Sequence, residues 1–276
     1  NGLTSFDSNG FGLGTGADGY NDDSETFVAW QWLAGGGSGS SNTDGSINTT
    51  TTSVNTTSGI SISTYTGTGS TATIGHGLGA VPKMILIKNR SATNAWAVYH
   101  ASASSAPETD YLVLDTTAAP VDDVNYWNDT TPTSSVFTIK SDGAVNTSSA
   151  TYVAYAFAEI EGFSNFHSYI GSGQENGSII YVGFSPNWVM IKKVSGTGSW
   201  VIYDRQRSTY NEVDDQLLAN VSTAETTGSE EIDFLSNGFK IRTDDSDVNT
   251  SGGDYIYAAF AEYPFGGKTL PPATAR

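Results

Sequence analysis

The groups that could do acid–base or nucleophilic chemistry are scarce in this chain. It holds three histidines, His76, His100 and His167, and no cysteine. The lack of cysteine excludes disulfides, thiolate zinc sites and thiol catalysis. A serine hydrolase commonly carries its nucleophile in a Gly-x-Ser-x-Gly turn before a helix, and the sequence has no such turn. We therefore predict that none of the three histidines is catalytic.

Paired carboxylates are another route to hydrolysis, because a glycosidase needs two of them across one bond. Glu159 and Glu262 each end a similar aromatic segment, but they lie about a hundred residues apart. We expect each carboxylate to close a strand or to accept a hydrogen bond in a turn. The sequence therefore predicts no enzyme. A depolymerase is the alternative, and it would need a carboxylate pair that the sequence does not display.

A short acidic stretch resembles the start of a calcium loop. Asp245, Asp247 and Asn249 alternate as oxygen donors do in such a loop, and Asp244 precedes them. The sixth loop position should be glycine and the twelfth glutamate, but Thr250 and Ile256 stand there. We interpret Asp244, Asp245 and Asp247 as solvated acidic turns and predict no cofactor, with a bound calcium ion as the alternative.

Four aromatic residues occur at matching positions in two parts of the chain: Trp96 with Tyr99, and Trp200 with Tyr203. Flat rings of this kind can stack on the apolar face of a sugar, which would make a glycan site. Buried aromatic anchors are the more common use of such residues. We predict that Trp96 and Trp200 are buried, each in the core of its own domain.

These matches belong to an internal repeat, which reveals the folding unit. Tyr65, Trp96 and Tyr99 recur as Tyr169, Trp200 and Tyr203 at an offset of 104, and the segment 152–159 recurs as 255–262 at 103. The predicted boundaries are 59–161 for repeat 1 and 162–265 for repeat 2, followed by a tail at 266–276. We expect the second copy to carry eight additional residues near Lys240 to Asp247.

The front of the chain resembles only the last third of a repeat. Ser8 to Phe11 matches Ser236 to Phe239, and Phe27 with Trp32 matches Tyr255 with Phe260. We therefore predict a partial repeat at 1–34 with a strand at Phe27 to Trp32, which must pair with an upstream segment or with another subunit. Residues 35–58 are rich in Gly, Ser, Thr and Asn, a composition typical of a linker.

The fold class follows from short apolar runs of five to seven residues that turn residues interrupt. Asn9-Gly10, Asp142-Gly143 and Asn237-Gly238 are hairpin signals, and no apolar period of 3.6 residues persists over a dozen positions. The sequence thus predicts an all-β protein: two tandem antiparallel β-sandwich repeats of about 100 residues each, plus the incomplete N-terminal repeat.

Charge and hydropathy limit the partners. The net charge of −17 disfavours nucleic acid and anionic membranes. The chain contains no run of 18 apolar residues, so the sequence predicts no membrane insertion.

Several segments resemble the repeats of tail and fibre-like virion proteins of marine and cyanobacterial bacteriophages. They are Gly75 to Lys88, 133–137, 152–159, 162–166, 232–243, 251–257, 264–267 and the Pro-Ala-Thr-Ala-Arg ending. The second copy departs from the first motif, with Gly183-Phe184-Ser185-Pro186 in place of Gly79-Ala80-Val81-Pro82. The resemblance therefore carries over no catalytic residue.

The resemblance implies a non-enzymatic virion structural protein, a tail fibre or adhesin that contributes to assembly and host attachment. The implied partners are copies of the chain itself, as a homotrimer, other virion proteins and a host-surface glycan. A carbohydrate-binding, lectin-like module and a capsid decoration or head-fibre protein are the alternatives.

Overall fold

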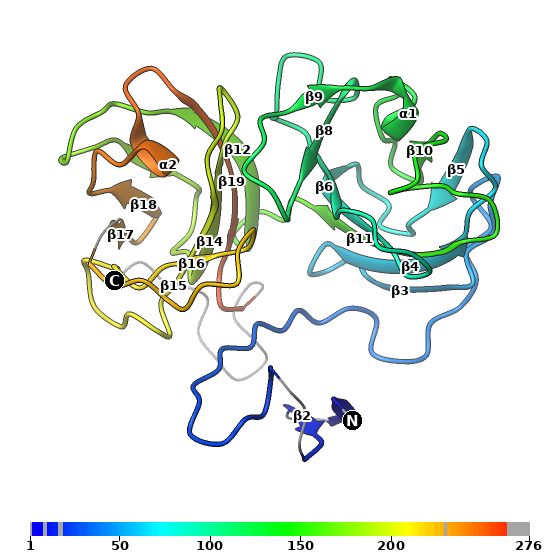
Figure 1. Ribbon diagram of the computed structural model, residues 1–276, viewed down its shortest axis with the longest axis horizontal. Helices are drawn as coiled ribbons and strands as arrows, with labels where there is room; N and C mark the ends of the chain where they lie inside the picture. Colours follow the sequence, from blue (N-terminus) through cyan, green and yellow to red (C-terminus); the bar gives the residue numbers. More distant parts are fainter. Residues whose placement is uncertain (1, 8–9, 16–18, 229–230, 264–276) are drawn as a thin grey trace. The chain divides into compact units, whose positions relative to one another are not determined.

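The computed structural model describes residues 2–7, 10–15, 19–228 and 231–263 (Figure 1). The chain divides into two compact units, Asn1–Trp32 and Leu33–Arg276. Across the described residues the protein is all-β, with antiparallel sheets and only two single-turn helices, which confirms the predicted all-β, antiparallel class. None of the described helices has the length and apolarity needed to cross a membrane. The predicted tail at 266–276 lies outside the described residues.

The first unit contains one hairpin, in which β1 (Leu3–Asp7) pairs with β2 (Gly10–Leu13). The similarity of residues 8–11 to 236–239 predicts a hairpin here. The predicted strand Phe27 to Trp32 is wrong, because these residues form no strand. Its equivalent in the second repeat, β19 (Asp254–Phe260), is a central strand with partners on both sides. The described residues of unit 1 supply no such neighbours, so the same sequence pattern has no sheet to join there.

The first sandwich lies in the second unit and consists of a seven-stranded sheet that faces a two-stranded one. The large sheet has the order β3-β4-β11-β6-β7-β8-β9, and β10 pairs with β5 in the small sheet. The bounds are β3 (Thr51–Asn55), β4 (Ile60–Thr66), β5 (Ala72–Gly75), β6 (Pro82–Asn89), β7 (Ala97–His100), β8 (Asp110–Val113), β9 (Val121–Asp122), α1 (Val124–Trp127), β10 (Val136–Ile139) and β11 (Thr151–Ala158).

The second sandwich pairs a five-stranded sheet, β12-β19-β14-β15-β16, with a three-stranded one, β13-β18-β17. Its strand order follows that of β4-β11-β6-β7-β8 and β5-β10 in the first sandwich. The bounds are β12 (Ser164–Ile170), β13 (Ile179–Tyr181), β14 (Trp188–Lys193), β15 (Trp200–Asp204), β16 (Leu217–Leu218), β17 (Ile232–Phe234), β18 (Gly238–Ile241) and α2 (Ser246–Asn249).

The two sandwiches also repeat individual side-chain contacts. Tyr65 stacks on Tyr152 at 5.1 Å and 12°, and Tyr169 stacks on Tyr255 at 5.0 Å and 11°. The hydroxyls of Tyr65 and Tyr169 donate to carbonyls at matching positions, 2.7 and 2.6 Å away. This agreement in both backbone pairing and side-chain geometry supports the repeat that the sequence offsets indicate.

The predicted insertion of eight residues near Lys240 to Asp247 is wrong. The step from Ile139 to Asn146 is seven residues, and the corresponding step from Ile241 to Asn249 is eight. The first copy is instead longer elsewhere. The step from His100 to Val136 is 36 residues, and the corresponding step from Asp204 to Gly238 is 34. Length differences are therefore small and occur in several loops.

The predicted linker at 35–58 is wrong for its C-terminal part. Residues 51–55 form β3, which pairs with β4 along all five residues, and Ile47 makes a parallel bridge to Ile74. Hydroxyls hold the segment in place, because Thr52 bonds to Thr49 at 2.8 Å and to Ser63 at 2.9 Å. Threonine has a high strand propensity, so a Thr-rich tract can be an edge strand as well as a linker.

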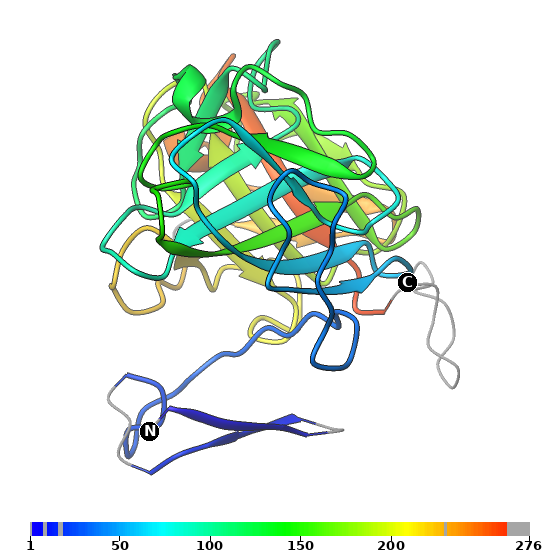
Figure 2. The same cartoon turned by 90° about the vertical axis from the view of Figure 1, so that its right-hand side faces the viewer.

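The large sheets of the two sandwiches pack against each other through their outer faces (Figures 1 and 2). Ala154, Ala156 and Ala158 of β11 belong to the core of the first sandwich, so Phe157 points to the opposite face of the sheet. There its ring lies 5.9 Å from that of Phe260 and 6.2 Å from that of Phe166. The sandwiches therefore form one block with an aromatic contact between them.

Candidate functional site

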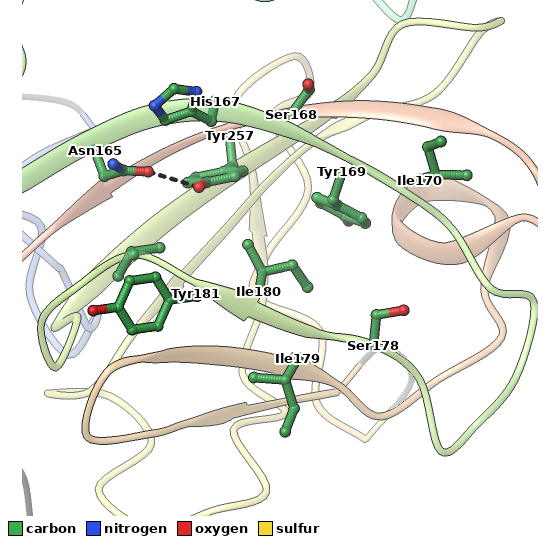
Figure 3. Close-up of a pocket in the computed structure, with 11 residues that line it drawn as sticks. Asn165, His167, Ser168, Tyr169, Ile170, Ser178, Ile179, Ile180, Tyr181 and Tyr257 are labelled. Atoms are coloured by element: carbon green, nitrogen blue, oxygen red, sulfur yellow. Dashed lines mark hydrogen bonds between the residues drawn. The ribbon is translucent and has the colours of Figure 1, made fainter.

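An open groove of about 590 Å³ runs along one side of the second sandwich (Figure 3). Its two walls are β12, the end strand of the large sheet, and β13, the end strand of the small sheet. Figure 3 shows the rings of Tyr169 and Tyr257 between these strands. The groove is lined by Asn165, His167, Ser168, Tyr169, Ile170, Ser178, Ile179, Ile180, Tyr181, Val182 and Tyr257.

The groove exists because the second sandwich lacks two features that close the first one: a set of serine–carbonyl hydrogen bonds and a covering strand. In the first sandwich, Ser61 and Ser63 of β4 donate to the carbonyls of His76 and Gly75, at 2.6 and 3.4 Å. β4 pairs with β11 in the first sandwich as β12 pairs with β19 in the second. This pairing places the larger Asn165 and His167 of β12 at the positions of Ser61 and Ser63. The first sandwich is also covered by β3 and by residues 46–47, which have no counterpart before β12.

The rim of the groove exposes large apolar side chains. Ile170 is 64% exposed, Ile179 62% and Tyr181 70%. Neighbouring exposed apolar residues of this size are typical of a surface that binds another molecule. Ile74 and Ile180 match each other, because each pairs with a phenylalanine of the neighbouring strand. Their flanking residues match in turn, so Tyr181 and Ile179 occupy the positions of Gly75 and Thr73.

Polar groups occupy the wall on β12. The Tyr257 hydroxyl donates to Asn165 Oδ1 at 2.6 Å, and burial, with the Glu159 carboxylate, raises the pKa of Tyr257. The Glu159 carboxylate lies 3.4 Å from His167 Nε2 and accepts from the Phe166 N–H at 3.4 Å. An aromatic floor with polar groups along one wall can bind either a sugar ring or a peptide.

The four aromatic residues predicted as a glycan platform or as core anchors lie outside this groove. Tyr99, Trp200 and Tyr203 are buried, with Trp200 only 1% exposed, so none of them is available to a glycan. Trp96 is half-buried, and the prediction that it is buried is wrong. Its ring lies 6.2 Å from that of Tyr155 and under the ammonium of Lys88.

The difference between the two tryptophans comes from the contact between the sandwiches. Trp200 Nε1 donates to the Val113 carbonyl at 2.9 Å, so the first sandwich covers this ring. The neighbouring Lys192 is fully buried and donates to the carbonyls of Thr117, at 3.1 Å, and Gly198, at 2.8 Å. Burial lowers the pKa of Lys192 to about 8.

Two of the three histidines are buried structural groups. His100 Nε2 donates to the Tyr257 carbonyl at 3.1 Å, and its Nδ1 accepts from the Ser102 N–H at 3.2 Å. This pairing fixes the neutral tautomer, and burial lowers the pKa of His100 to about 4. His76 has the same arrangement, between the Leu78 N–H and a carbonyl, and burial lowers its pKa too. Only His167 reaches the groove.

The acidic stretch that resembles a calcium loop serves to cap a helix. Asp245 is the N-cap of α2, and its Oδ1 accepts from the Asp247 N–H at 2.7 Å. Among the described residues, no three His, Cys, Asp or Glu side chains are arranged to hold a metal ion. Asp244 instead lines a second, more polar hollow with four other charged or amide side chains, namely Glu175, Asn176, Glu212 and Glu231, beside Arg242.

This polar hollow brings together carboxylates that the sequence does not single out. Arg242 donates to Glu212 at 2.7 Å and to Asp233 at 3.2 Å. Partial burial and the neighbouring Glu212 carboxylate raise the pKa of Glu231. Glu159 and Glu262, by contrast, are not brought together as a pair in the described contacts: Glu159 bonds to the groove wall, and Glu262 is exposed.

Sequence reasoning misses the groove residues His167 and Tyr181. The available signal is the exchange of small residues for large ones between matching strands, Ser63 for His167 and Gly75 for Tyr181. This exchange is hard to see in the sequence, because the offset between matching residues is 106 at β13 but 104 at the flanking strands β12 and β14.

The strand order and the edge groove define an all-β protein of stacked antiparallel sandwiches. The model of a domain of unknown function, DUF7483, matches residues 1–264, and the chain belongs to this family. No curated protein and no solved structure matches the chain significantly.

Proposed function

We propose that the chain is a non-enzymatic structural protein of a bacteriophage virion, a tail fibre or adhesin that assembles with copies of itself and attaches to the host surface. The stacked sandwiches support this role. The outer faces of their large sheets are joined by the rings of Phe157 and Phe260 and by hydrogen bonds from His100 and Trp200. A block tied together in this way can transmit force between its two ends.

The observation that carries the proposal is the open groove of the second sandwich. The same side of the first sandwich is closed by the chain's own β3. The second sandwich instead presents Ile170, Ile179 and Tyr181 to the surroundings. A protein with one closed and one adhesive sandwich suits a role in which one part builds the particle and another makes contact.

Adhesion to host cells tests this function. Fluorescently labelled protein should bind host cells saturably, and Tyr181→Ala should weaken that binding. Tyr210→Ala is the matched control, because Tyr210 is an exposed tyrosine (84%) that does not line the groove. Equal binding by both variants contradicts the proposed attachment surface.

Self-assembly is tested by the mass of the protein in solution. We expect a trimer at micromolar concentration, and a stable monomer contradicts the fibre-type assembly.

A carbohydrate-binding module is the second candidate, and the groove favours it through one feature. An exposed tyrosine ring, Tyr181, lies across from the amide of Asn165 and the imidazole of His167 (Figure 3). Sugar sites combine such a ring with nearby polar groups. Binding to specific glycans on an array, lost in Tyr181→Ala, would favour this function.

A further inference from the structure

We propose that the groove between β12 and β13 is a docking site for an extended, uncharged, hydroxyl-rich strand from another polypeptide chain. This inference goes beyond the attachment role, because it names a second kind of partner and a backbone mode of binding. Strand addition to an exposed sheet edge is a recurring mode of peptide recognition, in which main-chain hydrogen bonds supply affinity and side-chain pockets supply specificity.

The first sandwich shows what this kind of groove accepts. There, residues 46–55 run from the edge of the small sheet to the edge of the large one. The Ile47 N–H donates to the Thr73 carbonyl at 3.1 Å, and the Thr50 N–H donates to the Thr64 carbonyl at 2.7 Å. Residues 51–55 then pair with β4 in full register. One segment of ten residues, which ends in β3, thus bonds to both sheets.

The second sandwich has the same two edges without the strand. β12 and β13 stand at the ends of their sheets, and no described strand pairs with their outer sides. The Phe166 N–H faces outward, since it donates to the Glu159 side chain rather than to β19. Because alternate residues of a strand point their N–H groups the same way, that of Ser168 also faces outward. An exposed edge of this kind is a template for a further strand.

Charge and shape define the occupant. The residues that line the groove include no Asp, Glu, Lys or Arg, and the nearby Glu159 carboxylate is already held by His167 and the Phe166 N–H. Residues 46–55, Ser-Ile-Asn-Thr-Thr-Thr-Thr-Ser-Val-Asn, carry no charge either. A neutral strand therefore matches the groove.

Tyr181 sets a limit on the occupant. It stands where Gly75 lets the side chain of Asn42 approach closely in the first sandwich. The docked strand must therefore lack the turn that precedes residue 46, and its apolar side chains can pack on the exposed Ile179 and Tyr181.

The test uses a fluorescently labelled synthetic peptide of residues 46–55 and the full chain, with anisotropy as the readout. We expect saturable binding to the wild type. Ser168→Pro removes one outward N–H on an edge strand, where proline is tolerated, and should weaken binding at least about fivefold, the effect of losing roughly one hydrogen bond. Ser168→Ala keeps the N–H and should bind within about twofold of the wild type.

Thermal melting of each variant reports whether it folds. If Ser168→Pro does not fold, exchange of the Ser168 amide in the wild type, measured with and without peptide, replaces it, and the peptide should slow that exchange. Absence of saturable binding, or equal binding to Ser168→Pro, overturns the proposal. Glycan binding without peptide binding assigns the groove to carbohydrate. Host-cell adhesion can persist in either case, so the proposed function and this inference fail separately.

Discussion

Acidification should destabilise the stacked sandwiches through His100. The imidazole is buried between the Ser102 N–H and the Tyr257 carbonyl, so a second ring proton would point at a hydrogen-bond donor. Burial lowers its pKa in the folded protein from 6.5 to about 4. The unfolded chain therefore takes up a proton near pH 6.5, and the folded protein takes it up only near pH 4.

The sign and size of the effect follow from this difference. The contribution is fully present above about pH 6.5 and is lost as the pH falls toward about 4, because only the unfolded state binds the proton in that interval. At about pH 4.5 the loss from His100 is about 2.5 kcal/mol, from 1.36 kcal/mol per unit of pKa difference.

The assay is urea unfolding followed by tryptophan fluorescence at about pH 7.5 and about pH 4.5. The wild type should lose about 2.5 kcal/mol more of its free energy of unfolding between these pH values than His100→Gln does. Comparison of the two proteins removes the contributions of His76 and of the carboxylates. Equal pH dependence in the wild type and His100→Gln would refute the reasoning.

Five further substitutions test other parts of the structure by urea unfolding. Trp200→Ala should cost about 3 to 5 kcal/mol, because the ring is buried and its N–H is bonded, whereas half-buried Trp96→Ala should cost less than half of that; equal costs would contradict the burial difference. Asn146→Ala and Asn249→Ala should each cost about 2 to 3 kcal/mol, since each amide bonds to backbone at matching positions of the two sandwiches, and a cost confined to one of them would argue against equivalent roles. Asp245→Ala should cost about 1 kcal/mol through loss of the α2 cap, and added calcium should leave the wild-type melting temperature unchanged; a calcium-dependent rise would instead favour the metal site.

The sequence predicts the fold class and the repeat because both depend on local patterns. Alternating apolar runs and turn residues determine which segments become strands, and self-similarity locates the matching ones. The stacked tyrosine pairs of the two sandwiches are an example, since Tyr65 and Tyr169 recur at a constant offset. Such contacts lie inside one repeat and need no knowledge of what surrounds it.

The sequence fails where burial depends on contacts between repeats. Trp96 and Trp200 occupy matching positions on matching strands, yet only Trp200 is covered, because the first sandwich lies over it. The linker prediction fails for a related reason. A tract of threonines is hydrophilic by composition, and only the neighbouring hydroxyl of Ser63 and the open edge of β4 make it a strand.

The groove likewise depends on how the strands are arranged in the two sheets, and no local sequence motif encodes it. His167 and Tyr181 lie on strands of different sheets, which do not pair with each other. Both residues line the groove only because β12 and β13 end their sheets on the same side. A comparison of matching residues across the two copies, strand by strand, is the signal that would reveal it.

Labelling of intact phage particles tests the central claim most directly. The proposed function implies that a phage genome encodes the chain, so gold-conjugated antibodies raised against the purified chain would be applied to purified particles of that phage and viewed by electron microscopy. The proposed function predicts label at a fixed site on the particle, at the tail for a fibre or adhesin. Particles without label, with the protein found only free in the lysate of infected cells, would contradict it.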